Sequence, residues 1–282
     1  MTSRRSVVSS SELPPHEAER LLAARMQAAG NVMFIGGHMG PAMSRLVDGF
    51  LEGVGGTRVE YDAVSDAPLR EATRIAYGVD ELPAYDIEGA EMLLSFGNDF
   101  IDGGPSPVAH NRGLARMSGV DAEGHDKGTF VYLGPRLSTT GLNADEWLPI
   151  QAGSEAAVAL GMASHIAGGN ASGPYASLLA SYDLATASAA SGIDEDTLRE
   201  LADRFAEGSS VAMGPGAGAH HRNATAANLA ALILNDVAGN VGSTVTIGGG
   251  PATSSAPFSD LADAISAMAS GQVGVAFVHG TN

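Results

Sequence analysis

Short apolar runs that each end in glycine recur along the chain, and stretches of helical periodicity separate them. This alternation constrains the fold more than any other feature of the sequence. Strands separated by helices of about ten to fifteen residues indicate βαβ units and a parallel sheet, both faces of which must be covered. The runs are Ile35 before Gly36-Gly37, Phe96 before Gly97-Asn98, Leu133 before Gly134-Pro135, Met213 before Gly214-Pro215-Gly216, and Val278 before His279-Gly280. We therefore expect an α/β, Rossmann-like fold with a largely parallel sheet and helices on both faces.

These glycine turns are expected to come out on one edge of the sheet. That edge is the crevice where α/β proteins hold extended phosphorylated ligands against backbone N–H groups. No turn matches G-x-G-x-x-G, and no G-x-x-x-x-G-K-[ST] occurs. Two interpretations stay open: a nucleotide-like ligand, or glycines that the backbone needs for its turns alone.

The domain organisation is less constrained. Residues 1–13 are polar and rich in serine, which predicts a flexible tail. Residues 14–282 form the α/β region, as one body or as two interleaved subdomains, 30–170 and 171–282. No helix follows the strand that ends near Val278. Because a parallel sheet needs a covering helix, we expect this region to belong to a larger protein.

Composition removes several classes of function. The chain has 32 acidic and 15 basic residues, a formal charge of −17, and no cysteine. A positive face for nucleic acid is therefore not expected. Disulfides and Cys-ligated iron–sulfur clusters within these residues are excluded. No apolar run approaches the ~18 residues of a membrane span, and the serines after Arg4-Arg5 do not fit a signal peptide.

The segment 130–163 carries the strongest candidate residues. Arg136 follows a strand and suits either a phosphate or a buried carboxylate, for which Asp145 is the expected partner. The hydroxyls of residues 138–140 are equally suited to bind phosphate or to cap the local backbone.

Other polar residues are weaker candidates. Asp99 and Asp102 lie in a glycine-containing loop, which is typical of a solvated turn. His220 and His221 have no third ligand at a suitable spacing, so we expect a surface or capping role and predict no metal site. No Ser/His/Asp arrangement indicates a nucleophile, and we identify no catalytic residue.

Four ordered segments resemble the molybdopterin oxidoreductases of the dimethyl-sulfoxide-reductase superfamily. Residues 134–140 and 144–155 resemble its D-P-R-x-[ST]-x-T-A…A-D-x-W-L-x-I-x-P-G-[TS]-[DE] pattern. Residues 85–108 resemble the region that contains a strand and a G-x-N turn. Residues 238–242 resemble its T-G-N-x-G, and residues 279–282 its G-x-N-P strand end.

Within that superfamily, Phe100 with residues 106–108, and residues 137–146, look most like the iron–sulfur subunit of alternative complex III and its polysulfide-reductase-like relatives. This resemblance implies a cofactor-free scaffold in a membrane-associated respiratory complex that oxidises quinol. Iron–sulfur clusters, cytochrome c haem and the quinol site would reside on partner segments and subunits. It also implies attachment to the membrane through partners, on the bacterial extracytoplasmic face.

Three departures from the superfamily pattern agree with a lost cofactor. Gly134 stands where the pattern has an acid, Ala152 replaces the proline before Gly153, and no cysteine segment precedes the fold. The first alternative is a fragment of a true enzyme that binds the guanosine end of a bis-molybdopterin guanine dinucleotide cofactor. The second is a stand-alone nucleotide-binding module. If a cofactor is retained, the resemblance assigns its contacts to Gly97, Asn98, Arg136, Ser138, Ser154 and Glu155.

Overall fold

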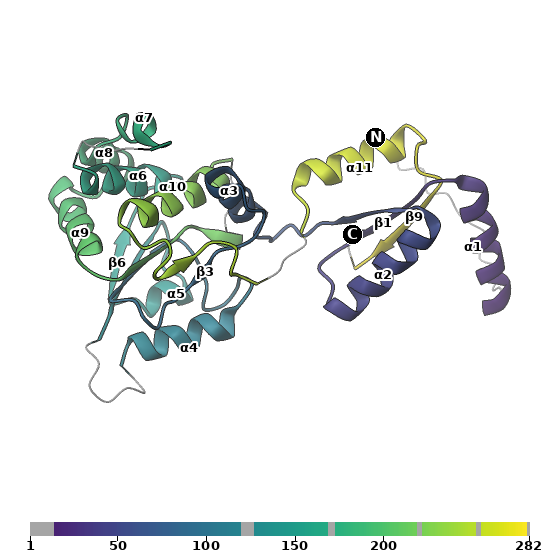
Figure 1. Cartoon of the computed structure of the whole chain (residues 1–282), viewed down its shortest axis with the longest axis horizontal. Helices are drawn as coiled ribbons and strands as arrows, with labels where there is room; N and C mark the ends of the chain where they lie inside the picture. The colour runs from purple at the N-terminus through teal and green to yellow at the C-terminus, as the bar shows by residue number, and fades with distance from the viewer. Residues whose placement is uncertain (1–13, 120–126, 169–172, 219–221, 252–254, 281–282) are drawn as a thin grey trace. The chain divides into compact units, whose positions relative to one another are not determined.

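The chain divides into two compact units. The computed structural model describes residues 14–119, 127–168, 173–218, 222–251 and 255–280, so the expected tail, 1–13, and His220-His221 lie outside the described residues. One unit comprises residues 1–62 with 255–282, and the other residues 63–254 (Figure 1). These bounds differ from the expected subdomains 30–170 and 171–282. The physical reason is that strand β7 (Ser210–Met213) pairs with β4 (Met92–Phe96) across the expected boundary.

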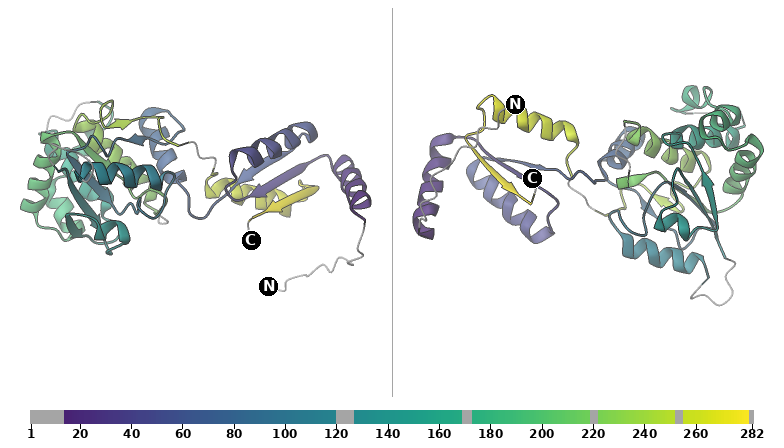
Figure 2. Two further views of the ribbon diagram at one scale, coloured as in Figure 1. Left: turned by 90° about the horizontal axis from the view of Figure 1, so that it is seen from below. Right: turned by 180° about the vertical axis from the view of Figure 1, so that it is seen from behind.

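The smaller unit is a three-stranded parallel sheet in the order β2-β1-β9. Its elements are α1 (Pro15–Ala29), β1 (Val32–Gly36), α2 (Pro41–Val54), β2 (Thr57–Glu60), α11 (Phe258–Ala269) and β9 (Val275–His279). Successive residues of β1 face opposite sides of the sheet: Val32 packs with Leu51 of α2, and Ile35 packs with Ala264 of α11. The two helices therefore cover opposite faces of this sheet (Figure 2).

The larger unit is built on a four-stranded parallel sheet in the order β6-β5-β4-β7. Its remaining strands are β3 (Ala84–Tyr85), β5 (Thr129–Gly134), β6 (Glu146–Pro149) and β8 (Val245–Thr246). Its helices are α3 (Ala67–Tyr77), α4 (Pro107–Met117), α5 (Thr139–Leu142), α6 (Glu155–Ile166), α7 (Ala176–Leu179), α8 (Leu184–Ser191), α9 (Glu195–Glu207), the 3-10 turn η1 (Gly216–Gly218) and α10 (Ala224–Val237). The expected α/β class, with largely parallel strands and helices on both faces, is confirmed.

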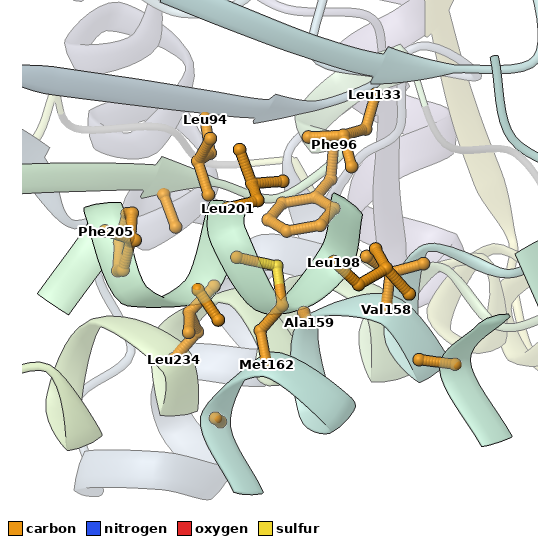
Figure 3. Packing of buried hydrophobic residues seen from close by; sticks show 14 of the residues in the cluster. Leu94, Phe96, Leu133, Val158, Ala159, Met162, Leu198, Leu201, Phe205 and Leu234 are labelled. Carbon is orange, nitrogen blue, oxygen red and sulfur yellow. The ribbon is translucent and has the colours of Figure 1, made fainter. Parts of the chain in front are cut away.

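Two hydrophobic layers enclose the larger sheet. On one face, Leu94 and Phe96 of β4 pack with residues from α6, α9 and α10, including Met162, Phe205 and Leu234 (Figure 3). On the other face, Leu93, Phe130 and Val211 pack with residues of α4 and the loop before it. The central strands are therefore buried on both sides, as their continuous apolar runs require.

The expectation that all five glycine turns share one edge was wrong. The turns after β1 and β9 belong to the smaller sheet, whereas those after β4, β5 and β7 belong to the larger one. A glycine turn follows parallel strands in both sheets, so the sequence pattern looks the same in each. The positions of these turns along the chain therefore cannot distinguish one sheet from two.

Two local features complete the larger unit. Asp194 caps α9 by accepting the N–H of Thr197 at 2.9 Å. Residues 82–87 contain β3, which pairs with β8 in an antiparallel ribbon. Two residues per strand are too few for the alternation that marks a strand in sequence.

The outer edge of β7 is closed by side chains. The N–H of Ala212 donates to Oδ1 of Asn235 at 2.9 Å, and Nδ2 of Asn235 donates back to the Ala212 carbonyl at 2.8 Å. At the start of the strand, Asn240 accepts from the Ser210 N–H and Thr244 donates to the Ser210 carbonyl. Helix α10 and the loop after it thus supply the pairing that a neighbouring strand would provide, and buried backbone groups are satisfied.

Replacing Asn235 by alanine is expected to destabilise the protein by about 2–4 kcal/mol. The substitution leaves the buried N–H and C=O of Ala212 without partners, and each such group costs about 1–3 kcal/mol. Urea unfolding of the variant measures the change, with Asn143→Ala, at an exposed position, as the matched control. Equal midpoints for the two variants would contradict the role assigned to Asn235.

Candidate functional site

The candidate site lies where β4, β5 and β7 end. Gly97 follows β4 with φ +73°, a left-handed conformation that glycine adopts without strain. Asn98 comes next, and its side-chain Nδ2 donates to the carbonyl of Gly214, after β7, at 2.7 Å. A Cβ on Gly216 would stand 2.8 Å from that same Nδ2. The side chain of Asn98 therefore ties two glycine turns together.

Asp99 is the centre of a second polar group. Its carboxylate accepts the hydroxyl of Tyr132 at 3.0 Å and the guanidinium of Arg136 at 2.8 Å. Tyr132 in turn accepts the hydroxyl of Ser138 at 3.1 Å. Burial raises the pKa of Tyr132 to about 12, so its hydroxyl stays protonated and donates to Asp99 at neutral pH.

The expected pairing of Arg136 with Asp145 was wrong. Asp145 instead pairs with Lys127 and accepts the N–H of Phe130. Arg136 pairs with Asp99, so Asp99 is an ion-pair partner rather than part of a merely solvated turn. The two ends of this pair are 37 residues apart, which explains why spacing along the chain favoured the nearer acid.

Two hydroxyls of segment 138–140 have structural partners. Ser138 is the N-cap of α5 and accepts the N–H of Gly141 at 3.2 Å. Thr140 accepts the N–H of Ile101, a residue far away in sequence, at 3.2 Å. Local capping, one of the two interpretations left open by the sequence, therefore describes Ser138.

These residues border a cavity of about 320 Å³. It is lined by Val64, Asn98, Asp99, Asp102, Gly103, Gly104, Arg136, Ser138, Thr139 and Ala217. Two carboxylates and one guanidinium thus face a space of the size that small-ligand sites occupy. Three of the predicted contacts, Asn98, Arg136 and Ser138, are brought together here.

The other predicted contacts lie apart from this cavity. Ser154 and Glu155 are buried at the start of α6 and are not among its lining residues. The Ser154 hydroxyl donates to the carbonyl of Gln151 at 2.6 Å. One carboxylate oxygen of Glu155 is buried without a hydrogen-bond partner among the described residues. Gly97 contributes the turn that positions Asn98.

Gly134 has a steric explanation in this structure. A Cβ at this position would stand 2.6 Å from Cε1 of the buried Tyr132 ring. The same ring would contact a Cβ on Gly141 at 2.9 Å. The acid that the superfamily pattern carries at position 134 cannot be accommodated while the Tyr132 ring stays where it is.

A larger cavity was not foreseen from the sequence. It measures about 600 Å³ and lies between α4 and the segments that contain β3 and Gly249-Gly250. His110 lines it, and burial lowers the pKa of this imidazole. Its Nδ1 has no hydrogen-bond partner among the described residues. A single histidine inside an otherwise ordinary helix gives no signal of this kind in sequence.

Within the described ranges, no cluster of three or more His, Asp or Glu side chains is arranged to hold a metal ion. None of the helices in the described part of the chain combines the length and hydrophobicity needed to cross a bilayer.

The chain is similar in sequence to proteins whose names refer to molybdopterin. No protein-family model matches the chain. The molybdopterin-binding-like subunit of menaquinone reductase from Nitratidesulfovibrio vulgaris is 28% identical over 242 residues, which cover 80% of this chain and 33% of that protein. The molybdopterin-containing subunit ArrA of the arsenate respiratory reductase of Shewanella sp. is 35% identical over 83 residues, 29% of this chain and 9% of ArrA. The chain thus spans about a third of the first relative's length.

Solved structures agree on the fold. Acetylene hydratase from Pelobacter acetylenicus superposes with a TM-score of 0.64 at 16% identity, covering 84% of this chain and 34% of that enzyme. Sequence and fold therefore point the same way: over a partial length, the chain is similar to proteins of the molybdopterin oxidoreductase superfamily.

Proposed function

We propose that this chain is the scaffold part of a molybdopterin-oxidoreductase-like subunit in a membrane-associated electron-transfer complex that oxidises quinol, of the alternative complex III type. In this proposal the chain carries no cofactor of its own. Electrons pass through iron–sulfur clusters and haem on partner segments and subunits, because the chain has no cysteine to ligate them.

The link to quinone is supported by a relative. The Nitratidesulfovibrio vulgaris protein is named as a subunit of a menaquinone reductase and as molybdopterin-binding-like. Its name supports a quinone-linked complex with partner subunits, but not the direction of electron flow. The proposal of quinol oxidation rests instead on the resemblance of Phe100 with residues 106–108, and of residues 137–146, to alternative complex III. The proposed extracytoplasmic location rests on the same resemblance.

The single observation that carries the scaffold proposal is the state of the predicted contacts. The Asn98 amide bonds to Gly214, and Arg136 pairs with Asp99. The Ser138 hydroxyl bonds to Tyr132, and its oxygen caps α5. A pyrophosphate at this edge would face the carboxylates of Asp99 and Asp102 and would have to break these bonds. These residues do not fit the phosphate part of a molybdopterin guanine dinucleotide.

The alternative keeps a cofactor. The cavity of about 320 Å³ at the sheet edge is large enough for a nucleoside, and it includes three of the residues that the resemblance assigns. ArrA is named as molybdopterin-containing. In this alternative the chain is a fragment of a molybdenum enzyme and holds the guanosine end of the cofactor.

Elemental analysis separates the two. We expect the native assembly, purified with its partner subunits, to contain iron and haem but no stoichiometric molybdenum or tungsten. Inductively coupled plasma mass spectrometry, normalised to the amount of this chain, measures the content. About one molybdenum or tungsten atom per chain would reject the scaffold proposal in favour of the cofactor-binding alternative.

A substitution in the assembly tests the same point by activity. Arg136→Gln is expected to leave the rate of quinol oxidation within about twofold, because the side chain is largely exposed and its pair with Asp99 contributes little. Asn235→Ala, which disturbs the sheet, serves as the comparison that reduces the yield of assembly. A large loss of turnover in Arg136→Gln at normal assembly would contradict the scaffold role.

A further inference from the structure

We infer that Asp99 closes the phosphate position of this sheet edge, so that the cavity rejects phosphate-bearing ligands by charge and admits only uncharged ones such as a nucleoside. The inference rests on the proposed cofactor-free function and assigns that property to one side chain. It makes Asp99 the residue that sets ligand specificity here.

Asp99 is held at the sheet edge by its backbone and by a buried partner. Its backbone carbonyl accepts the N–H groups of Asp102 and Gly103, at 3.2 and 3.0 Å, which closes the turn after Asn98. Its carboxylate accepts the hydroxyl of the buried Tyr132. The side chain of Asp99 is 24% exposed, whereas that of Arg136 is 73% exposed, so the carboxylate is the less exposed member of the pair.

The carboxylate of Asp99 uses the one cation among the described residues that line this cavity. A phosphate at a strand end is bound by cations and by hydroxyl or N–H donors. Here the guanidinium of Arg136, which lines the cavity, donates to Asp99, and so does the hydroxyl of the buried Tyr132 behind it. The Asp99 carboxylate thus takes the place of an anionic ligand within the chain itself.

Charge, rather than size, is what excludes a phosphate ester from this cavity. The cavity of about 320 Å³ has room for a nucleoside, so a phosphate ester is not excluded for lack of space. Its lining residues carry two carboxylates and a single guanidinium. With Arg136 neutralised by Asp99, the carboxylate of Asp102 leaves the lining negative, and like charges brought together oppose binding.

Removing the charge of Asp99 tests the inference. Isothermal titration calorimetry of the full chain with guanosine and with GDP gives the ratio of the two affinities. Asp99→Asn is expected to shift this ratio toward GDP by about tenfold to a hundredfold, because it frees Arg136 and removes one repulsive charge. Asp102→Asn is the matched control: it removes the same charge from the same cavity but frees no cation, and we expect a shift below about threefold.

Three outcomes would overturn the inference. They are equal shifts in Asp99→Asn and Asp102→Asn, no measurable GDP binding to Asp99→Asn, and a preference of the unmodified chain for GDP. A second variant traces the gain to its source. Arg136→Gln added to Asp99→Asn should abolish the gained GDP affinity, and a gain that persists would also reject the proposed mechanism.

If Asp99→Asn does not fold, the inference can still be tested with Arg136→Gln. Thermal unfolding checks each protein, and Arg136→Gln alone should not strengthen GDP binding, because it leaves the carboxylates of Asp99 and Asp102 without a cation. Stronger GDP binding in this single variant would overturn the inference without any need for Asp99→Asn. Failure of the inference is distinct from failure of the proposed function. Molybdenum in the assembly rejects the scaffold, whereas an unchanged nucleotide preference with no molybdenum rejects only the role of Asp99.

Discussion

Closure of the outer edge of β7 is the constraint on which the rest of the larger unit depends. Asn235 pairs with both backbone groups of Ala212, as a neighbouring strand would. Because α10 is thereby held against the sheet, the turn at Gly214 has a fixed position beside the turn after β4. Asn98 then bridges the two turns with one short hydrogen bond. The geometry of the candidate site therefore depends on the hydrogen bonds that Asn235 makes with the backbone of β7.

The polar groups at the sheet edge form a closed set. The carboxylate of Asp99 accepts hydrogen bonds from Arg136 and Tyr132, and the hydroxyl of Tyr132 accepts one from Ser138. A site preorganised for an anion has donors that are not bonded to other protein groups. A donor that already makes a hydrogen bond within the protein must lose that bond before it can bind a ligand, which costs affinity. In this chain the donors of Arg136, Tyr132 and Ser138 are already used by neighbouring groups of the protein.

Sequence reasoning found the fold class because parallel strands buried on both faces leave continuous apolar runs such as residues 92–96. It also singled out Arg136, which follows a strand, and Ser138, which begins a helix, and the structure places both at one cavity. It assigned Arg136 to Asp145, since only separation along the chain was visible, whereas the sheet brings Asp99 to it. The split into two sheets left no trace, because glycine follows parallel strands in both. His110 was missed for a similar reason: its surroundings come from segments far away in sequence.

The ring of Tyr132 joins three positions into one packing unit. Its edge lies where a side chain at residue 134 or 141 would stand, and its hydroxyl holds the carboxylate that holds Arg136. Any homologous chain that carries an acid at position 134 must therefore have a smaller or displaced side chain at position 132. Such an exchange would remove the phenol from the Asp99 carboxylate and put a new acid beside Arg136. Gain or loss of a ligand at this edge is thus expected to appear as covariation of positions 132, 134 and 141, rather than as change at the charged residues alone.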